Sequence, residues 1–190
     1  MALAALLKEV KSMPIWVALF RGINVGGHRK VPMKALRGLF ERLEFTDVKT
    51  YIQSGNAVFA SSQHNPERIG TTLSEAFERE FGFAVQILVL SADAFVDVLN
   101  ACPFQAGEAD ENLVHVFFFA EGIPASDVVE PIEKVRAATE QIHLGDRAFY
   151  LRAPDGIGRS RLVSRIDRLL GVPTTARNLK SVSAIAALTA

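Results

Sequence analysis

Two spacings of hydrophobic residues alternate along the first half of the chain. Short apolar runs bounded by turn residues predict strands over 15–20, 48–53, 56–60 and 85–90. Apolar residues at helical spacing predict helices after Pro32 and over 66–81, and Ser91 caps a further predicted helix that ends at Asn100. The order strand, helix, strand, strand, helix, strand is that of the ferredoxin-like split βαβ unit.

The second half shows a similar order with one strand fewer. Strands are predicted over 113–119, 141–144 and 148–151, helices over 128–139 and 160–170, and a last helix from Thr175 or Asn178. We therefore expect an α+β protein of two ferredoxin-like subdomains packed together, with mostly antiparallel sheets. The expected boundaries are an N-terminal extension over 1–13, a first subdomain over 14–100, a linker over 101–112 and a second, βαββα-type subdomain over 113–190.

The connection from the first strand to the first helix is longer than the usual span of about two to six residues. It reads Arg-Gly-Ile-Asn-Val-Gly-Gly-His-Arg-Lys-Val over 21–31, with three glycines and several cationic side chains. A cationic, glycine-bearing loop before a helix is typical of an anion site, because glycine lets backbone N–H groups converge. Its candidate ligand-binding residues are Arg21, Asn24, Gly26, Gly27 and Lys30. The alternative is a structural loop whose glycines and asparagine satisfy its own backbone.

The expected topology brings a second segment to the same place. A right-handed crossover makes the first two strands parallel, so the first strand ends at the edge where the hairpin over 53–56 turns. Gln53, Ser54 and Asn56 should therefore lie beside the long loop, either as ligand donors or as ordinary turn residues.

A second, weaker candidate site lies in the C-terminal half. Arg159 and Ser160 follow two glycines at an expected helix start, and Arg177 and Asn178 precede the last helix. The alternatives are a capping loop for the first pair and an N-cap with a surface arginine for the second. His115 is expected to be a core histidine, and the four histidines show no metal-ligand spacing.

Two motifs of the first half carry a resemblance to a known family. They are Arg-Gly-Ile-Asn-Val-Gly-Gly over 21–27, followed by Val-Pro-Met over 31–33, and Thr-Tyr-Ile-Gln-Ser-Gly-Asn over 50–56. Together they resemble a bacterial family of uncharacterised proteins, the domain of unknown function numbered sixteen-ninety-seven. Similar C-terminal motifs extend the resemblance over about residues 14–188, although Leu-Lys-Ser over 179–181 replaces a Trp-Asn-Thr-like run. The resemblance implies two ferredoxin-like subdomains and no established activity.

Composition narrows the function classes. The 190 residues are 49% hydrophobic with a formal net charge of zero, whereas dedicated nucleic-acid-binding domains are usually basic. No apolar run approaches the roughly 20 residues of a membrane span. The single cysteine, Cys102, excludes an internal disulfide and fits a cytoplasmic protein.

These observations favour binding of a small anionic ligand, such as a phosphate-containing metabolite or a nucleotide. The expected place is the edge formed by the long loop and the turn over 53–56. The alternatives are an RNA-binding or protein-interaction module, and an enzyme of unidentified reaction. The sequence does not identify a cofactor, and no carboxylate pair lies beside the candidate site.

Overall fold

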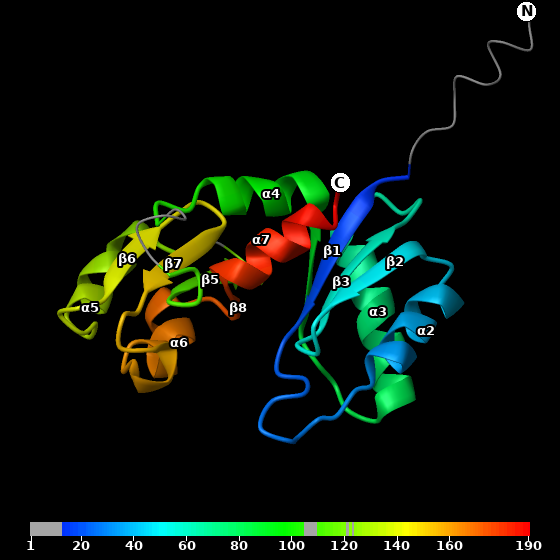
Figure 1. Cartoon of the computed structure of the whole chain (residues 1–190), viewed down its shortest axis with the longest axis horizontal. Helices are drawn as coiled ribbons and strands as arrows, with labels where there is room; N and C mark the ends of the chain where they lie inside the picture. Colours follow the sequence, from blue (N-terminus) through cyan, green and yellow to red (C-terminus); the bar gives the residue numbers. More distant parts are fainter. Residues whose placement is uncertain (1–12, 105–109, 121, 123) are drawn as a thin grey trace, which may run out of the picture.

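The computed structural model of the chain describes residues 13–104, 110–120, 122 and 124–190. Most of the expected N-terminal extension, over 1–12, and the middle of the expected linker, over 105–109, lie outside these residues. The described residues form an α+β structure with two four-stranded antiparallel sheets (Figure 1). Each sheet is built from one half of the chain.

The first sheet has the strand order β2-β3-β1-β4. Its strands are β1 (Ile15–Phe20), β2 (Thr46–Tyr51), β3 (Asn56–Ala60) and β4 (Ile87–Ser91). Because β1 and β2 each run antiparallel to β3, they are parallel to one another with β3 between them, as predicted. Helices α2 (Met33–Arg42) and α3 (Pro66–Phe81) cover one face, where Phe20, Phe40 and Phe77 pack into one core.

The second sheet has the equivalent order, β6-β7-β5-β8. Its strands are β5 (Val114–Phe119), β6 (Gln141–Leu144), β7 (Ala148–Arg152) and β8 (Thr174–Asn178). The prediction that this half lacks a fourth strand is wrong, because β8 pairs antiparallel with β5. Thr175 begins no helix, whereas Asn178 caps the last helix by accepting a hydrogen bond from the backbone N–H of Ser181 at 2.9 Å.

The helices on the outer face of the second sheet are shorter than predicted. They are η1 (Ser126–Val128) with α5 (Val129–Glu133), then η2 (Ile157–Arg159) and η3 (Val163–Arg165) with α6 (Ile166–Leu170). α5 ends at Glu133, and in the turn that follows the carboxylate of Glu140 accepts a hydrogen bond from the backbone N–H of Ala137. None of the helices in the described part of the chain is long and apolar enough to cross a membrane.

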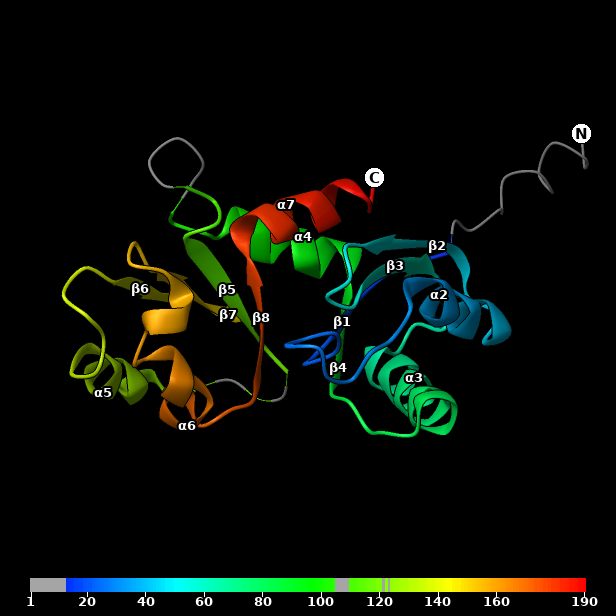
Figure 2. The same cartoon turned by 60° about the horizontal axis from the view of Figure 1, so that its bottom comes forward.

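Two helices join the halves. The predicted helix after β4 is α4 (Ala92–Asn100), and the last helix is α7 (Leu179–Ala187). Both lie between the two sheets (Figures 1 and 2), in a core that unites Val17 and Leu19 of β1 with Val116 and Phe118 of β5. β1 is therefore covered on both faces, which is why its apolar residues do not alternate with polar ones.

Candidate functional site

The glycines of the long loop form a tight turn. Val25 and His28 make an isolated antiparallel bridge, and the backbone N–H of His28 donates to the Val25 carbonyl at 3.1 Å. Gly26 and Gly27 lie between them with φ of 58° and 79°. Two consecutive positive φ values are what a type I′ turn requires, and glycine adopts them without a Cβ clash. The two glycines therefore have a structural reason to be there, and both are exposed, as is Lys30.

Asn24 ties this loop to the turn between β2 and β3. Its amide nitrogen donates to the carbonyls of Val31 at 2.9 Å and Gln53 at 2.7 Å. Its amide oxygen accepts from the backbone N–H of Val31 at 2.7 Å. The loop and the turn thus lie together, as the topology predicted. Both amide N–H groups of Asn24 are used in these contacts, so the structural role of Asn24 is to hold the long loop to the turn.

Arg21 makes an ion pair with the other half of the chain. Its guanidinium lies 2.6 Å from a carboxylate oxygen of Asp167 in α6, and it donates to the side chain of Gln86 at 3.3 Å. The other oxygen of Asp167 accepts from the backbone N–H and the hydroxyl of Thr174. Arg21 was one of the candidate ligand-binding residues of the long loop. Its charge already has a carboxylate partner.

Arg177 reaches from β8 into the first half. Its Nε donates to the side-chain oxygen of Asn56 at 2.5 Å, and its Nη2 donates to the carbonyls of Phe20, Ser54 and Gly55 at 2.8 to 3.2 Å. These groups are the end of β1 and the turn between β2 and β3. The other arginine nitrogen, Nη1, donates to the Ala176 carbonyl.

The guanidinium of Arg177 has no acidic partner among the residues that the structure describes. None of the ion pairs among the described residues involves it, and burial lowers its pKa from 12.5 to about 10. An arginine has five N–H groups. One goes to Asn56, two from Nη2 go to the carbonyls and one to Ala176, so one N–H of Nη1 has no partner within the described residues.

Beside Arg177 the surface has a hollow of about 300 Å³, between the two halves. We call it the Arg177 hollow. Its polar lining residues are Ser54, His115, Arg177, Asn178 and Ser181, and the apolar ones include Val25 and Ile52. None of its lining residues is acidic. Part of the first candidate group and part of the second, weaker one therefore meet in one place, although they are more than a hundred positions apart.

His115 differs from its predicted role. It is half-buried, and its Nδ1 is a buried atom without a hydrogen-bond partner in the described part of the chain. Burial lowers the pKa of its imidazole, and the nearby Leu113 carbonyl opposes this shift. The apolar run over 113–119 correctly predicted a strand. It could not show that the end of the strand borders a hollow, because that hollow depends on the other half.

The remaining candidate residues do not line the Arg177 hollow. Asn56 is fully buried, and its amide N–H groups donate to the Tyr51 carbonyl and the Ser54 hydroxyl. Ser160 caps a turn by accepting from the backbone N–H of Val163, and Arg159 is exposed. Neither of the last two lines the hollow.

Cys102 has no sign of reactivity. It is buried, burial raises the pKa of its thiol, and its Sγ lies 3.8 Å from the Phe104 carbonyl. A buried thiol with a raised pKa is a poor nucleophile. Among residues 13–104, 110–120, 122 and 124–190, no cluster of three or more His, Cys, Asp or Glu side chains could hold a metal ion.

Comparisons with known proteins agree with the resemblance of the N-terminal motifs. A model of the family described as "Protein of unknown function (DUF1697)" matches residues 13–150, and the C-terminal motifs lie beyond that match. A search of curated proteins gives no match. Among solved structures, the conserved bacterial protein SP0830 from Streptococcus pneumoniae is similar in fold, with a TM-score of 0.75 at 24% identity, over 94% of this chain and 100% of that one. Since the family model covers more than half of the sequence, the chain belongs to the DUF1697 family of proteins of unknown function.

Proposed function

We propose that the protein binds a small anionic ligand, a phosphate-bearing metabolite or a nucleotide, in the Arg177 hollow. The observation that carries the proposal is the Arg177 guanidinium, a buried charge without an acidic partner in the described residues, beside an open hollow. A buried charge is costly unless it is paired, so an anion in the hollow would relieve a penalty that the protein otherwise bears.

The polar groups of the hollow suit such a ligand. The Ser54 hydroxyl accepts from Asn56, which leaves its own proton available to a ligand oxygen. The Ser181 hydroxyl has no partner among the described groups and lies in the first turn of α7. The positive end of a helix dipole favours an anion there. With the free Nη1 N–H of Arg177, these groups form a set of donors without a competing carboxylate.

An RNA-binding module is the less favoured alternative. RNA-recognition folds of related topology stack bases on exposed aromatic residues of the sheet. Both faces of β1 are buried here, one against α2 and α3 and the other against α4 and α7. That burial leaves no exposed aromatic side chain on β1 on which a base could stack. The common strand order of the two sheets supports the inference that each half is a ferredoxin-like unit, but the fold does not by itself carry a function.

Ile52 offers the sharpest test, because it lines the hollow and folding does not need its side chain. It is 52% exposed and has a φ of 46°, a region that a β-branched residue adopts under strain and that Asn and Asp tolerate. Ile52→Asn and Ile52→Asp should therefore both fold at least as well as the wild type. Of the two variants, only Ile52→Asp adds a negative charge to the lining of the Arg177 hollow.

Binding is measured by calorimetric titration with inorganic phosphate, pyrophosphate and ATP at constant ionic strength. We expect Ile52→Asn to bind like the wild type and Ile52→Asp to bind about fivefold or more weakly, less so at high salt. Equal affinity of the two variants would place the anion elsewhere. Absence of binding for all three probes would contradict the proposal for phosphate-bearing ligands.

A further inference from the structure

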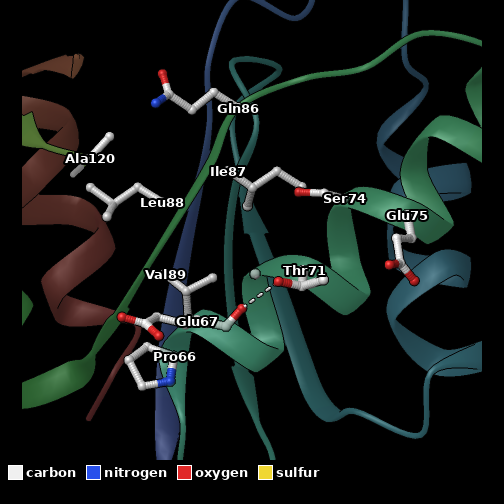
Figure 3. A pocket seen from close by; sticks show the side chains of 11 residues that line it. Pro66, Glu67, Thr71, Ser74, Glu75, Gln86, Ile87, Leu88, Val89 and Ala120 are labelled. Atoms are coloured by element: carbon white, nitrogen blue, oxygen red, sulfur yellow. Dashed lines mark hydrogen bonds between the residues drawn. The ribbon is translucent and has the colours of Figure 1, made fainter.

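A second and larger hollow, of about 490 Å³, follows the outer edge of the first sheet. Its walls are α3 on one side and β4 on the other, with Ala120, the residue after β5, across from them (Figure 3). We call it the β4 groove. It shares no lining residue with the Arg177 hollow, so the two can be tested separately.

The backbone of β4 turns half of its polar groups toward this groove. The backbone N–H of Arg21 donates to the Gln86 carbonyl, and Leu19 lies opposite Leu88. In an antiparallel pair the residues bonded to the neighbouring strand alternate with residues whose N–H and C=O point away. Gln86 and Leu88 therefore bond to β1, while Ile87 and Val89 direct theirs away from it. Because β4 is the last strand of its sheet, no strand among the described residues pairs with them.

Two other edge strands, β2 and β6, show features that protect a sheet edge, and β4 shows neither of them. β2 has a register shift between Thr46 and Lys49, and Lys49 bonds to the end of α7. β6 has only four residues. β4 reads Ile-Leu-Val-Leu-Ser, without a charge, a proline or an irregular register. Natural proteins rarely leave such an edge open, because it is a template for pairing with another chain.

The charged side chains that line the β4 groove are acidic, which favours a cationic occupant. Glu67 and Glu75 of α3 line it, and neither takes part in an ion pair among the described residues. No basic residue lines it. Figure 3 shows Glu67 beside Val89 and Glu75 farther along α3, with Ile87 directed toward Ser74 of α3 and Leu88 directed the other way, toward Ala120. The wall is recessed at Gly70, where an added Cβ would meet nothing closer than 3.8 Å.

We propose that the β4 groove binds an extended, cationic segment of a partner protein, which adds a strand to the free edge of β4. Strand addition takes its affinity from main-chain hydrogen bonds and its specificity from the side chains next to the edge. Here Ile87 and Val89 supply the hydrogen-bonding groups, and Glu67 and Glu75 attract lysine or arginine side chains of the segment. A second copy of this chain fits less well, because a symmetric β4–β4 contact would bring the acidic α3 helices of both copies to the same interface.

Synthetic peptides test the proposal with the full chain. The probe is a labelled, end-capped heptapeptide that alternates valine and lysine, and its binding is followed by fluorescence anisotropy. A second peptide carries N-methyl groups along one edge, which removes the hydrogen bonds of strand addition. A third has glutamate in place of lysine. We expect the first to bind at least tenfold more tightly than either of the others, and to slow hydrogen exchange at the amides of Ile87 and Val89.

Variants of groove residues test whether the peptide binds in the β4 groove. Gly70→Gln fills the recess with a residue that favours helix, so the protein should be at least as stable as the wild type. The peptide should then bind at least tenfold more weakly. Gly38→Gln is the matched control, since Gly38 is a helical glycine of α2, outside the groove, whose added Cβ meets only the tip of Arg42. The double change Glu67→Lys with Glu75→Lys should reverse the preference between the lysine and glutamate peptides.

Each other outcome overturns the proposal. If the lysine peptide does not bind, or if the N-methylated peptide binds equally well, there is no strand addition. If Gly70→Gln binds like Gly38→Gln, the peptide lies elsewhere. If the wild type forms dimers that Gly70→Gln abolishes, the occupant of the edge is a second copy of this chain.

Discussion

The Nε of Arg177 donates a hydrogen bond of 2.5 Å to the side-chain oxygen of Asn56, a residue 121 positions earlier in the chain. Asn56 in turn holds the turn between β2 and β3, and Arg177 bonds to the backbone carbonyls of the same turn. One arginine of the second half thus completes the hydrogen bonding of the loop edge of the first half. The ligand proposal and the stability of the interface therefore depend on the same side chain.

Replacement of Arg177 should destabilise the protein even without a ligand. In Arg177→Gln the Phe20, Ser54 and Gly55 carbonyls lose their arginine donor, and an unsatisfied buried group costs about 1–3 kcal/mol. We expect a loss of about 2–4 kcal/mol in the free energy of unfolding, measured by urea denaturation. Arg159→Gln is the control, because Arg159 is exposed and its loss should change stability by less than about 0.5 kcal/mol.

A double-mutant cycle separates the contact with Asn56 from the other effects of Arg177. We expect Asn56→Ala and Arg177→Gln to be non-additive by about 1 kcal/mol or more, because the two side chains contact each other directly. Additive effects would mean that this contact contributes little. Arg21→Gln should cost under about 1 kcal/mol in the same urea measurement, because its ion pair with Asp167 is partly exposed to solvent.

The close approach of the turn over 53–56 to β1 predicts a large effect at Gly55. Its φ is 74°, and an added Cβ would lie 2.7 Å from side-chain atoms of both Phe20 and Ile23. Gly55→Ala should therefore destabilise by about 2–4 kcal/mol, from backbone strain and overpacking together.

Gly82 is the matched control for Gly55. It caps α3 with a φ of 76°, and nothing lies within 4 Å of an added Cβ. Gly82→Ala has the same backbone strain without the clash, so it should cost about 1 kcal/mol. Both are measured by thermal and urea unfolding. Equal losses would show that the turn can move away from Ile23.

Local patterns of the sequence were sufficient for most elements of the first half. β1 and β3, and helix α3 with its cap at Gly82, have the predicted bounds, because apolar spacing and capping residues are local signals. β8 was missed because Thr-Thr-Ala-Arg-Asn is short and polar. Its identity as a strand comes from pairing with β5, which no local pattern contains.

The candidate site could be predicted only in part for the same reason. Topology correctly brought the long loop and the turn over 53–56 together, and Asn24 joins them. The predicted topology could not show that Arg21 pairs with Asp167. It also could not show that Arg177, rather than Arg21, is the buried cation without an acidic partner among the described residues. Those relations depend on how the two halves pack, and each partner is distant in the sequence.

His115 should report both burial and ligand binding through its titration. Burial lowers its folded-state pKa below the ordinary value of 6.5, so the unfolded chain binds more protons as the pH falls. The stability contributed by the neutral imidazole is present above about pH 6.5 and is lost as the pH falls toward the folded pKa. The free energy of unfolding should therefore fall more for the wild type than for His115→Gln between about pH 7.5 and pH 5.

An NMR titration of the imidazole tests the same residue with ligand present. An anion in the Arg177 hollow favours the charged imidazole, so pyrophosphate should raise the pKa of His115. His115→Gln assigns the resonance. An unchanged pKa at saturating pyrophosphate would contradict binding in this hollow, even if the protein binds the anion.

The core between the two sheets predicts that the halves unfold together. Val17 and Leu19 of the first half and Val116 and Phe118 of the second pack in one cluster around α4 and α7. The Tyr150 hydroxyl also donates to the Val98 carbonyl of α4 at 2.7 Å, inside that cluster. Separation would expose these apolar side chains, each worth about 1.5–3 kcal/mol when buried. The full chain should therefore show one calorimetric transition, with equal calorimetric and van't Hoff enthalpies.

Chains limited to residues 1–104 or 110–190 provide the complementary measurement. Each keeps its own sheet but loses half of the shared core, so each should bind a hydrophobic dye and lack a near-ultraviolet circular dichroism signal. Mixing the two should restore the signal if the core reassembles. A sharp, independent unfolding transition for residues 1–104 alone would mean that the first half is stable without the second. The contacts of Arg177 would then join two finished domains, and Arg177→Gln should affect ligand binding much more than folding.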